Sequence, residues 1–265
     1  MSLWQQAGVT FFAYLLLVIG GRRLLSRHAT TRLARIWLAA AGSVLGIAVL
    51  LYTERTTQPE VLMEWLLPPA ILLLAYWTSG FLFVRPVGWQ ERMLVWMDDR
   101  LGVRDAAGAI PRAVAELLEA AYVGVYPLVL VGFLLHLAFA VQPDPARFWA
   151  VVLVTDFICF GFLPWIQTRP PRALEAGDPW SATTRTLNLR LLGATSINVN
   201  TFPSGHAAEA LVVALLTIDA PPPIVALMFA SALAVSAGAV LGRYHYLADA
   251  LAGWVVAFLV WAWIW

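Results

Sequence analysis

The sequence predicts an all-α polytopic membrane protein with about eight transmembrane helices. Of the 265 residues, 61% are hydrophobic and only 12% are charged, whereas a soluble domain has about 25% charged residues. Many apolar stretches reach the length of about 18 residues that a membrane helix needs. The net charge of +1 gives no sign of nucleic-acid binding, and we expect none. Cys159 is the single cysteine, so an internal disulfide is excluded.

Three spans are expected before a more polar segment, at residues 3–20, 33–52 and 61–84. Pro68 and Pro69 are expected to kink the third of these helices. Residues 85–112 then alternate large apolar side chains with charged ones, which predicts either an amphipathic helix in the membrane surface or an ordinary connecting helix. We take residues 1–112 as an N-terminal transmembrane region.

The remaining spans are expected at residues 113–141, 148–167, 206–218, 224–241 and 250–265. We assign residues 113–265 to a catalytic bundle formed by the last five or six helices. His136 lies among leucines and is expected to pack or form a hydrogen bond rather than bind a ligand. Asp156 is an acid inside a span, where acids are costly and often functional. It either orients an arginine of the site or forms a hydrogen bond between helices.

The sequence Pro203-Ser204-Gly205-His206 stands at the start of the sixth span. Its proline and glycine predict a turn that leads into a helix N-terminus. Unpaired amides and the helix dipole favour an anion there, and His206 could donate a proton to a phosphate oxygen. The alternative is a turn in which the histidine only caps a helix.

Further reactive residues flank the other spans, with Arg169 and Arg172 after the fifth, and Arg243, His245 and Asp249 after the seventh. The sixth and seventh spans form a hairpin, so we expect all these residues on the same side of the membrane as His206. His245 and Asp249 are four residues apart, so the aspartate can hold the imidazole tautomer. Such a site could bind a phosphate, attack it and protonate the leaving oxygen.

These motifs resemble the second and third signatures of the type 2 phosphatidic acid phosphatase superfamily, over about residues 113–265. That group contains lipid phosphate phosphatases, lipid phosphotransferases and soluble vanadium haloperoxidases. The resemblance implies that His245 is a nucleophile forming a phosphohistidine, that Asp249 activates it and that His206 protonates the leaving group. It also implies that Ser204 and Gly205 help to hold the phosphate, and that no metal or other cofactor takes part.

Two positions depart from the signatures of that family. Its first signature has a lysine seven residues before an Arg-Pro pair; Arg169 matches the arginine, but Phe162 stands at the lysine position. Its third signature has an arginine six residues before the histidine, where this chain has Ala239. The motif forms resemble more closely the branch that contains inositolphosphoryl-ceramide synthases. All 17 basic residues are arginines, and we expect phosphate to be bound by Arg169, Arg172 and Arg243.

The leading prediction is therefore an integral membrane enzyme that hydrolyses a phosphomonoester or diphosphate of a lipid. One alternative is a phosphotransferase that passes the phosphoryl headgroup to an alcohol. A second is a transporter with a phosphate-binding loop, for which His136 and Asp156 would suit a proton path.

Charge also predicts an orientation in the membrane. With eight spans, the side that carries the site also carries most of the remaining arginines: Arg22, Arg23, Arg27, Arg32, Arg85, Arg92, Arg100, Arg104, Arg112, Arg185 and Arg190. The other side carries Arg55 and Arg147. The positive-inside rule then places the site on the cytoplasmic face of a bacterial plasma membrane. Most proteins that the chain resembles work on the outer or lumenal face instead.

Overall fold

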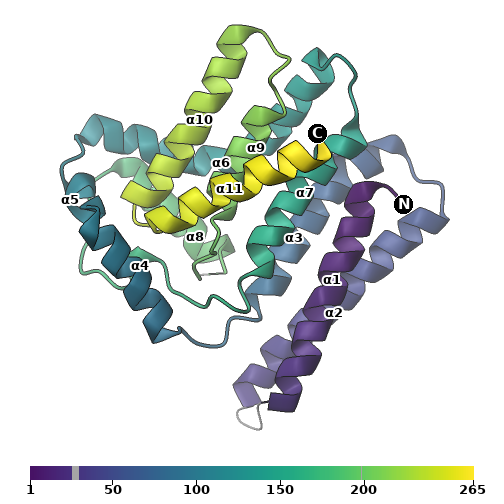
Figure 1. Ribbon diagram of the computed structural model, residues 1–265, viewed down its shortest axis with the longest axis horizontal. Helices are drawn as coiled ribbons and strands as arrows, with labels where there is room; N and C mark the ends of the chain where they lie inside the picture. Colours follow the sequence, from purple (N-terminus) through teal and green to yellow (C-terminus); the bar gives the residue numbers. More distant parts are fainter. Residues whose placement is uncertain (26–29, 198) are drawn as a thin grey trace.

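The computed structural model describes residues 1–25, 30–197 and 199–265 (Figure 1). Helices make up 76% of the chain, and no strand occurs in the part described, so the prediction of an all-α membrane protein is confirmed. Arg27 of the basic loop lies outside the described residues, and the side chains of Arg22, Arg23 and Arg32 are not described either.

The first two helices, α1 (Leu3–Leu25) and α2 (Thr30–Arg55), form a hairpin at one side of the molecule (Figure 1). Gly46 on α2 allows close contact, because a Cβ there would lie 2.4 Å from the Phe12 ring of α1. Helix α1 also packs along α7 (Pro145–Gly161), so the N-terminal region is joined to the rest of the bundle.

The segment predicted as the third span contains a change of helix type. A π-helical turn (Leu62–Leu66) precedes α3 (Leu67–Gly80), and the Leu67 amide donates to the Leu62 carbonyl five residues back. Pro68 and Pro69 stand in the first turn of α3, where an amide has no intrahelical partner to lose. The prolines therefore stand where the π-helical turn passes into α3.

Residues 85–112 contain two short helices, α4 (Gly88–Arg100) and α5 (Val103–Gly108). Trp89 and Trp96 on α4 are 59% and 58% exposed, whereas Glu91 and Asp98 on the opposite face are buried. Gly102 has a φ of 64°, a left-handed conformation that glycine adopts without strain, and it separates the two helices. Helix α4 thus presents aromatic side chains outward, as the interfacial alternative requires.

The C-terminal bundle consists of α6 (Arg112–Phe139), α7, α8 (Thr183–Thr195), α9 (Gly205–Leu215), α10 (Pro222–Leu241) and α11 (Leu247–Ile264). Helix α9 is central, since it packs against α6, α7, α10 and α11. Gly253 of α11 makes this packing possible, because a Cβ there would lie 2.5 Å from the Ser204 carbonyl oxygen. Helix α8, inside the long polar connection, has no counterpart among the predicted elements.

Five helices in the described part are long and apolar enough to cross a membrane, namely α1, α2, α6, α10 and α11. Helices α3, α7 and α9 have 14, 17 and 11 residues and fall short of that length. The predicted count of eight spans is therefore not established.

His136, near the end of α6, is buried and hydrogen-bonded. Its Nε2 accepts from the Asp144 amide at 3.1 Å, and its ring lies 5.5 Å from that of Phe148. The expectation that this histidine has a packing and hydrogen-bonding role is confirmed.

Candidate active site

Three polar segments, far apart in sequence, meet at one end of the bundle. Backbone hydrogen bonds join them: the Arg172 amide to the Arg243 carbonyl (3.0 Å), the Ser204 amide to the Asp249 carbonyl (2.9 Å) and the Asn200 amide to the Thr168 carbonyl (3.0 Å). Main-chain contacts fix the segments more tightly than flexible side chains would. The predicted convergence of the motifs is therefore observed.

The two motif histidines face one another. The ring centroids of His206 and His245 are 5.9 Å apart and tilted by 49°. Behind His245, its Nδ1 lies 3.4 Å from Oδ2 of Asp249, which is fully buried. That oxygen also accepts from the Tyr246 amide at 2.8 Å, which fixes the carboxylate. This distance is longer than that of a normal hydrogen bond, and catalytic pairs are often this far apart when no substrate is bound.

The surroundings of His245 favour its neutral form. Burial, and then the nearby Arg172 guanidinium, lower the pKa of His245 to about 3. The imidazole is therefore uncharged near neutral pH and keeps a lone pair for nucleophilic attack. Since Nδ1 faces Asp249, the attacking atom would be Nε2.

Ser204 and Gly205 form the turn at the N-terminus of α9. The Ser204 hydroxyl accepts from the Ala207 amide at 3.4 Å and caps the helix. The preceding Phe202–Pro203 peptide is cis. At Gly205, a Cβ would lie 3.2 Å from the Phe160 ring and 3.3 Å from the Asp156 carboxylate. The first amides of α9 lack intrahelical partners and can bind an anion beside His206.

Two of the three predicted phosphate ligands are already paired with carboxylates. Arg169 donates to both oxygens of Glu91, at 3.0 and 2.9 Å. Arg243 is buried and pairs with Asp98 at 2.7 Å and with Glu175 at 2.6 Å. Glu91 and Asp98 both come from α4, so this surface helix holds the site loops in place. Sequence reasoning missed these acids, although they alternate with the tryptophans of that segment.

Arg172 differs from the other two arginines. Its guanidinium carbon lies 5.1 Å from the centroid of the Tyr244 ring, and its side chain has no ion pair or hydrogen bond within the described ranges. It is also close enough to lower the pKa of His245. Arg172 is therefore the arginine open to a phosphate group.

An aromatic column connects Arg172 to His206. Tyr122 of α6 stacks on the His206 ring at 5.1 Å and on the Tyr244 ring at 4.2 Å. Ala239, at the position of the family arginine, is buried in the same cluster. Phe162, at the position of the family lysine, is 45% exposed and lines a surface cavity with Tyr14. Neither departure therefore leaves an unfilled position next to the histidines.

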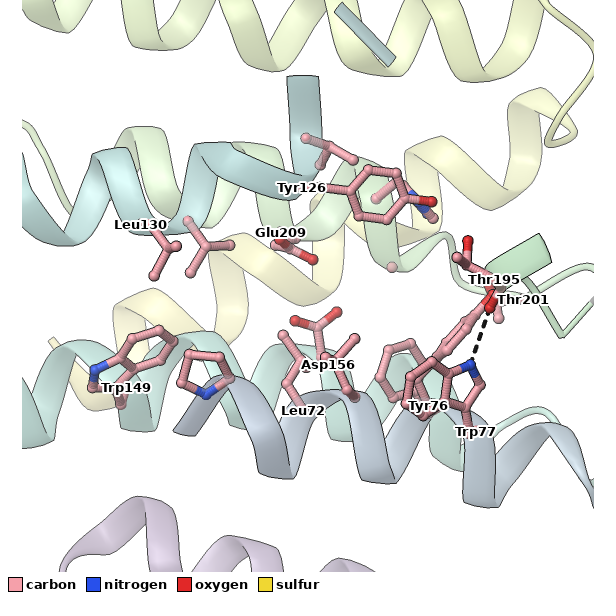
Figure 2. A pocket seen from close by; sticks show the side chains of 17 residues that line it. Leu72, Tyr76, Trp77, Tyr126, Leu130, Trp149, Asp156, Thr195, Thr201 and Glu209 are labelled. Carbon is pink, nitrogen blue, oxygen red and sulfur yellow. Dashed lines mark hydrogen bonds between the residues drawn. The ribbon is translucent and has the colours of Figure 1, made fainter. Parts of the chain in front are cut away.

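A cavity of about 330 Å³ extends from His206 between α3, α6, α7 and α9 (Figure 2). Asp156 and Glu209 point toward one another across it. Asp156 is fully buried, and neither of its oxygens has a hydrogen-bond partner in the part of the chain described. Both predicted roles of Asp156, orienting an arginine and bonding between helices, are therefore wrong for this structure.

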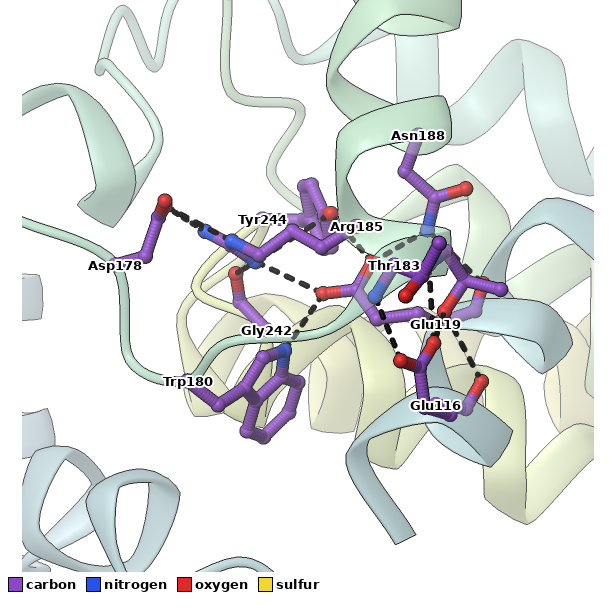
Figure 3. A network of polar contacts seen from close by, with 10 residues as sticks. Glu116, Glu119, Asp178, Trp180, Thr183, Arg185, Asn188, Gly242 and Tyr244 are labelled. Atoms are coloured by element: carbon purple, nitrogen blue, oxygen red, sulfur yellow. Dashed lines mark hydrogen bonds and ion pairs between the residues drawn. The ribbon is translucent and has the colours of Figure 1, made fainter. Parts of the chain in front are cut away.

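Glu119 of α6 is a second buried acid, and it is fully engaged (Figure 3). It accepts from Trp180 Nε1 at 2.8 Å, from Arg185 Nη1 at 2.9 Å and from the Tyr244 hydroxyl at 2.7 Å. Asn188 of α8 donates to it as well. This network fixes the 176–188 segment and Tyr244 behind the site. The rule that singled out Asp156, an acid within a span, would also have found Glu119.

Within residues 1–25, 30–197 and 199–265, no group of three or more histidine, cysteine, aspartate and glutamate side chains has a geometry that could hold a metal ion.

Comparison with known families gives one match. Residues 145–265, from the start of α7 to the last residue, match the family model of the PAP2 superfamily. No curated protein and no solved structure matches the chain. Members of this superfamily are usually phosphatases or phosphotransferases that act on lipid phosphates in a membrane. The inositolphosphoryl-ceramide-synthase branch is not distinguished by the match.

Proposed function

We propose that the protein is an integral membrane lipid phosphate phosphatase that works through a phosphohistidine on His245. The observation that carries the proposal is the facing pair of histidine rings, 5.9 Å apart, with Asp249 behind one of them. The PAP2 match supports the phosphatase or phosphotransferase class. We narrow the phosphate-binding group to Arg172, Ser204 and Gly205, because Arg169 and Arg243 are held by carboxylates.

The reaction has two steps. Nε2 of neutral His245 attacks phosphorus, the ester P–O bond breaks, and His206, which gains a proton once the charged phosphate is bound beside it, gives that proton to the leaving oxygen. His206, now neutral, takes a proton from water as the water attacks phosphorus, and the P–N bond breaks to regenerate His245. The Arg172 guanidinium and the amides at the start of α9 stabilise charge on the phosphoryl oxygens.

Purified protein, mixed with a panel of lipid phosphates and diphosphates in detergent micelles, tests the proposal. We expect release of inorganic phosphate from at least one lipid, and a protein-bound, alkali-stable phosphoryl label that His245→Ala abolishes. Adding alcohol acceptors separates hydrolysis from phosphotransfer, which would transfer the label to the alcohol. Absence of both products, and of the label, with every lipid would contradict the proposal and leave the transporter alternative.

We also propose that the site faces the cytoplasm, as arginine distribution predicts. Ser181 and Pro222 are both exposed, and they lie at the site end of the bundle and in the α9–α10 turn, respectively. In a chain without Cys159, single cysteines at these two positions should differ in their labelling by an impermeant thiol reagent on intact cells. Labelling is expected at Pro222→Cys but not at Ser181→Cys, and the reverse pattern would overturn the orientation.

A further inference from the structure

The cavity beside His206 is mostly apolar, and part of its wall lies at the outer surface. Its walls carry aliphatic and aromatic side chains from α3 and α6, and several of these are also exposed on the outer surface: Leu73 (47%), Trp77 (43%), Tyr126 (45%) and Leu130 (42%). A lipid chain in the bilayer could therefore enter between these two helices. The volume of about 330 Å³ is within the usual range of small-molecule sites, about 300–1,000 Å³.

The carboxyl pair does not fit a purely apolar pocket. Figure 2 shows Asp156 and Glu209 about midway between the end marked by Leu130 and the end marked by Thr201. Both oxygens of Asp156 are buried and unpaired within the described residues. A buried polar group without a partner is costly, and such groups are rare unless a ligand or water completes them.

The position of Asp156 and Glu209 relative to His206 limits which part of a substrate these two acids can contact. Glu209 is three residues after His206 on α9, which puts it about 4.5 Å further along the helix axis and on the same face. If His206 protonates the ester oxygen, the carboxyl pair reaches the carbon atoms next to that oxygen. Carboxyl oxygens there favour a hydrogen-bond donor on the lipid, such as an amine or a hydroxyl.

We propose that Asp156 and Glu209 form a specificity subsite for an amine or hydroxyl next to the phosphate ester of the lipid. This inference rests on the proposed phosphatase function and deepens it. One wall of the cavity comes from α3, which lies outside the 145–265 match, so this helix contributes to the choice of substrate.

Two lipids of equal chain length test the subsite. Sphinganine 1-phosphate carries an amine on the carbon next to the ester carbon and a hydroxyl on the carbon after that, whereas octadecyl phosphate carries neither. We expect wild-type protein to prefer sphinganine 1-phosphate by about tenfold to a hundredfold in kcat/KM, the usual effect of hydrogen bonds to a charged group. A wild-type ratio near one would overturn the inference without any variant.

Variants then assign the preference to the pair. Asp156→Leu and Glu209→Met remove the acceptors, keep similar volume and suit a membrane helix, so each should bring the ratio toward one. Leu72→Met, on the apolar wall, is the matched control and should keep the wild-type ratio. A ratio that survives both acidic substitutions would overturn the subsite, and so would a parallel loss on both lipids. Failure of wild-type protein to act on any lipid phosphate would instead contradict the proposed function.

Discussion

Two buried acids on neighbouring helices, Glu119 and Asp156, differ in their hydrogen bonding. Glu119 accepts hydrogen bonds from four side chains, and every one of its donors belongs to the protein. Asp156 is equally buried but faces a cavity and has no partner in the described part of the chain. A buried acid whose hydrogen bonds are satisfied fixes structure, whereas an unsatisfied one at a cavity points to a ligand.

The arginines and histidines also fall into two groups, those bound by other protein groups and those that face the site. Arg169 and Arg243 are held by carboxylates, whereas Arg172 is open. His136 Nε2 accepts a hydrogen bond from the Asp144 amide, whereas the ring of His245 faces that of His206. Arg172 lies close to His245, whose ring faces His206 at one end of the cavity that Asp156 lines.

The largest effect is expected at the histidines. His245→Ala should lower turnover about 10⁴-fold, because the nucleophile is lost. His136→Gln, the control, keeps an acceptor for the Asp144 amide and should leave kcat unchanged within about twofold. Phosphate release from the best lipid substrate measures both. Near-full activity of His245→Ala would remove it from the nucleophile role.

The next largest effect concerns stability. Glu119→Met leaves the Arg185 guanidinium, which is 3% exposed, without its buried partner, and should destabilise the fold by about 3–5 kcal/mol. Asp156→Leu breaks no hydrogen bond and should change stability by less than about 1 kcal/mol. Denaturant unfolding in mixed micelles gives both values. Equal losses would show that Asp156 is a structural acid like Glu119.

A smaller effect is expected on the catalytic step. Arg172→Lys should lower kcat about tenfold to a thousandfold, about 1.4–4 kcal/mol, since a guanidinium can hold two phosphoryl oxygens and an ammonium cannot. Arg190→Lys, at an exposed position on α8, serves as the control. Arg169→Lys should reduce kcat less than Arg172→Lys does, because Arg169 is bound to Glu91. A larger loss at Arg169 would restore it as a direct phosphate ligand.

No effect is expected from a chelator. The described residues offer no cluster of three or more side chains for a metal ion, and the proposed steps use only protein groups. Activity should therefore persist in EDTA, with phosphate release measured before and after dialysis. Loss in EDTA that a divalent ion restores would contradict the mechanism, and would suggest that Asp156 and Glu209 hold a cation.

The sequence by itself determined the membrane class, the approximate position of most helices and the meeting of the three motifs. These follow from local rules: apolar length sets a span, and proline and glycine set a turn. His245 lies just before α11, whose first turn holds Asp249, so the two stay close at 3.4 Å. Such rules need no knowledge of how helices pack.

Only the tertiary structure decided which charged groups are paired and which are open. The partners of Arg243 are Asp98 and Glu175, 145 and 68 residues away, and no periodicity links them. The facing of Asp156 and Glu209 likewise depends on how α7 and α9 are rotated against one another. Helix rotation and close approach are set by small contacts, such as that of Gly253 with the Ser204 carbonyl, and those contacts exist only once the bundle has packed.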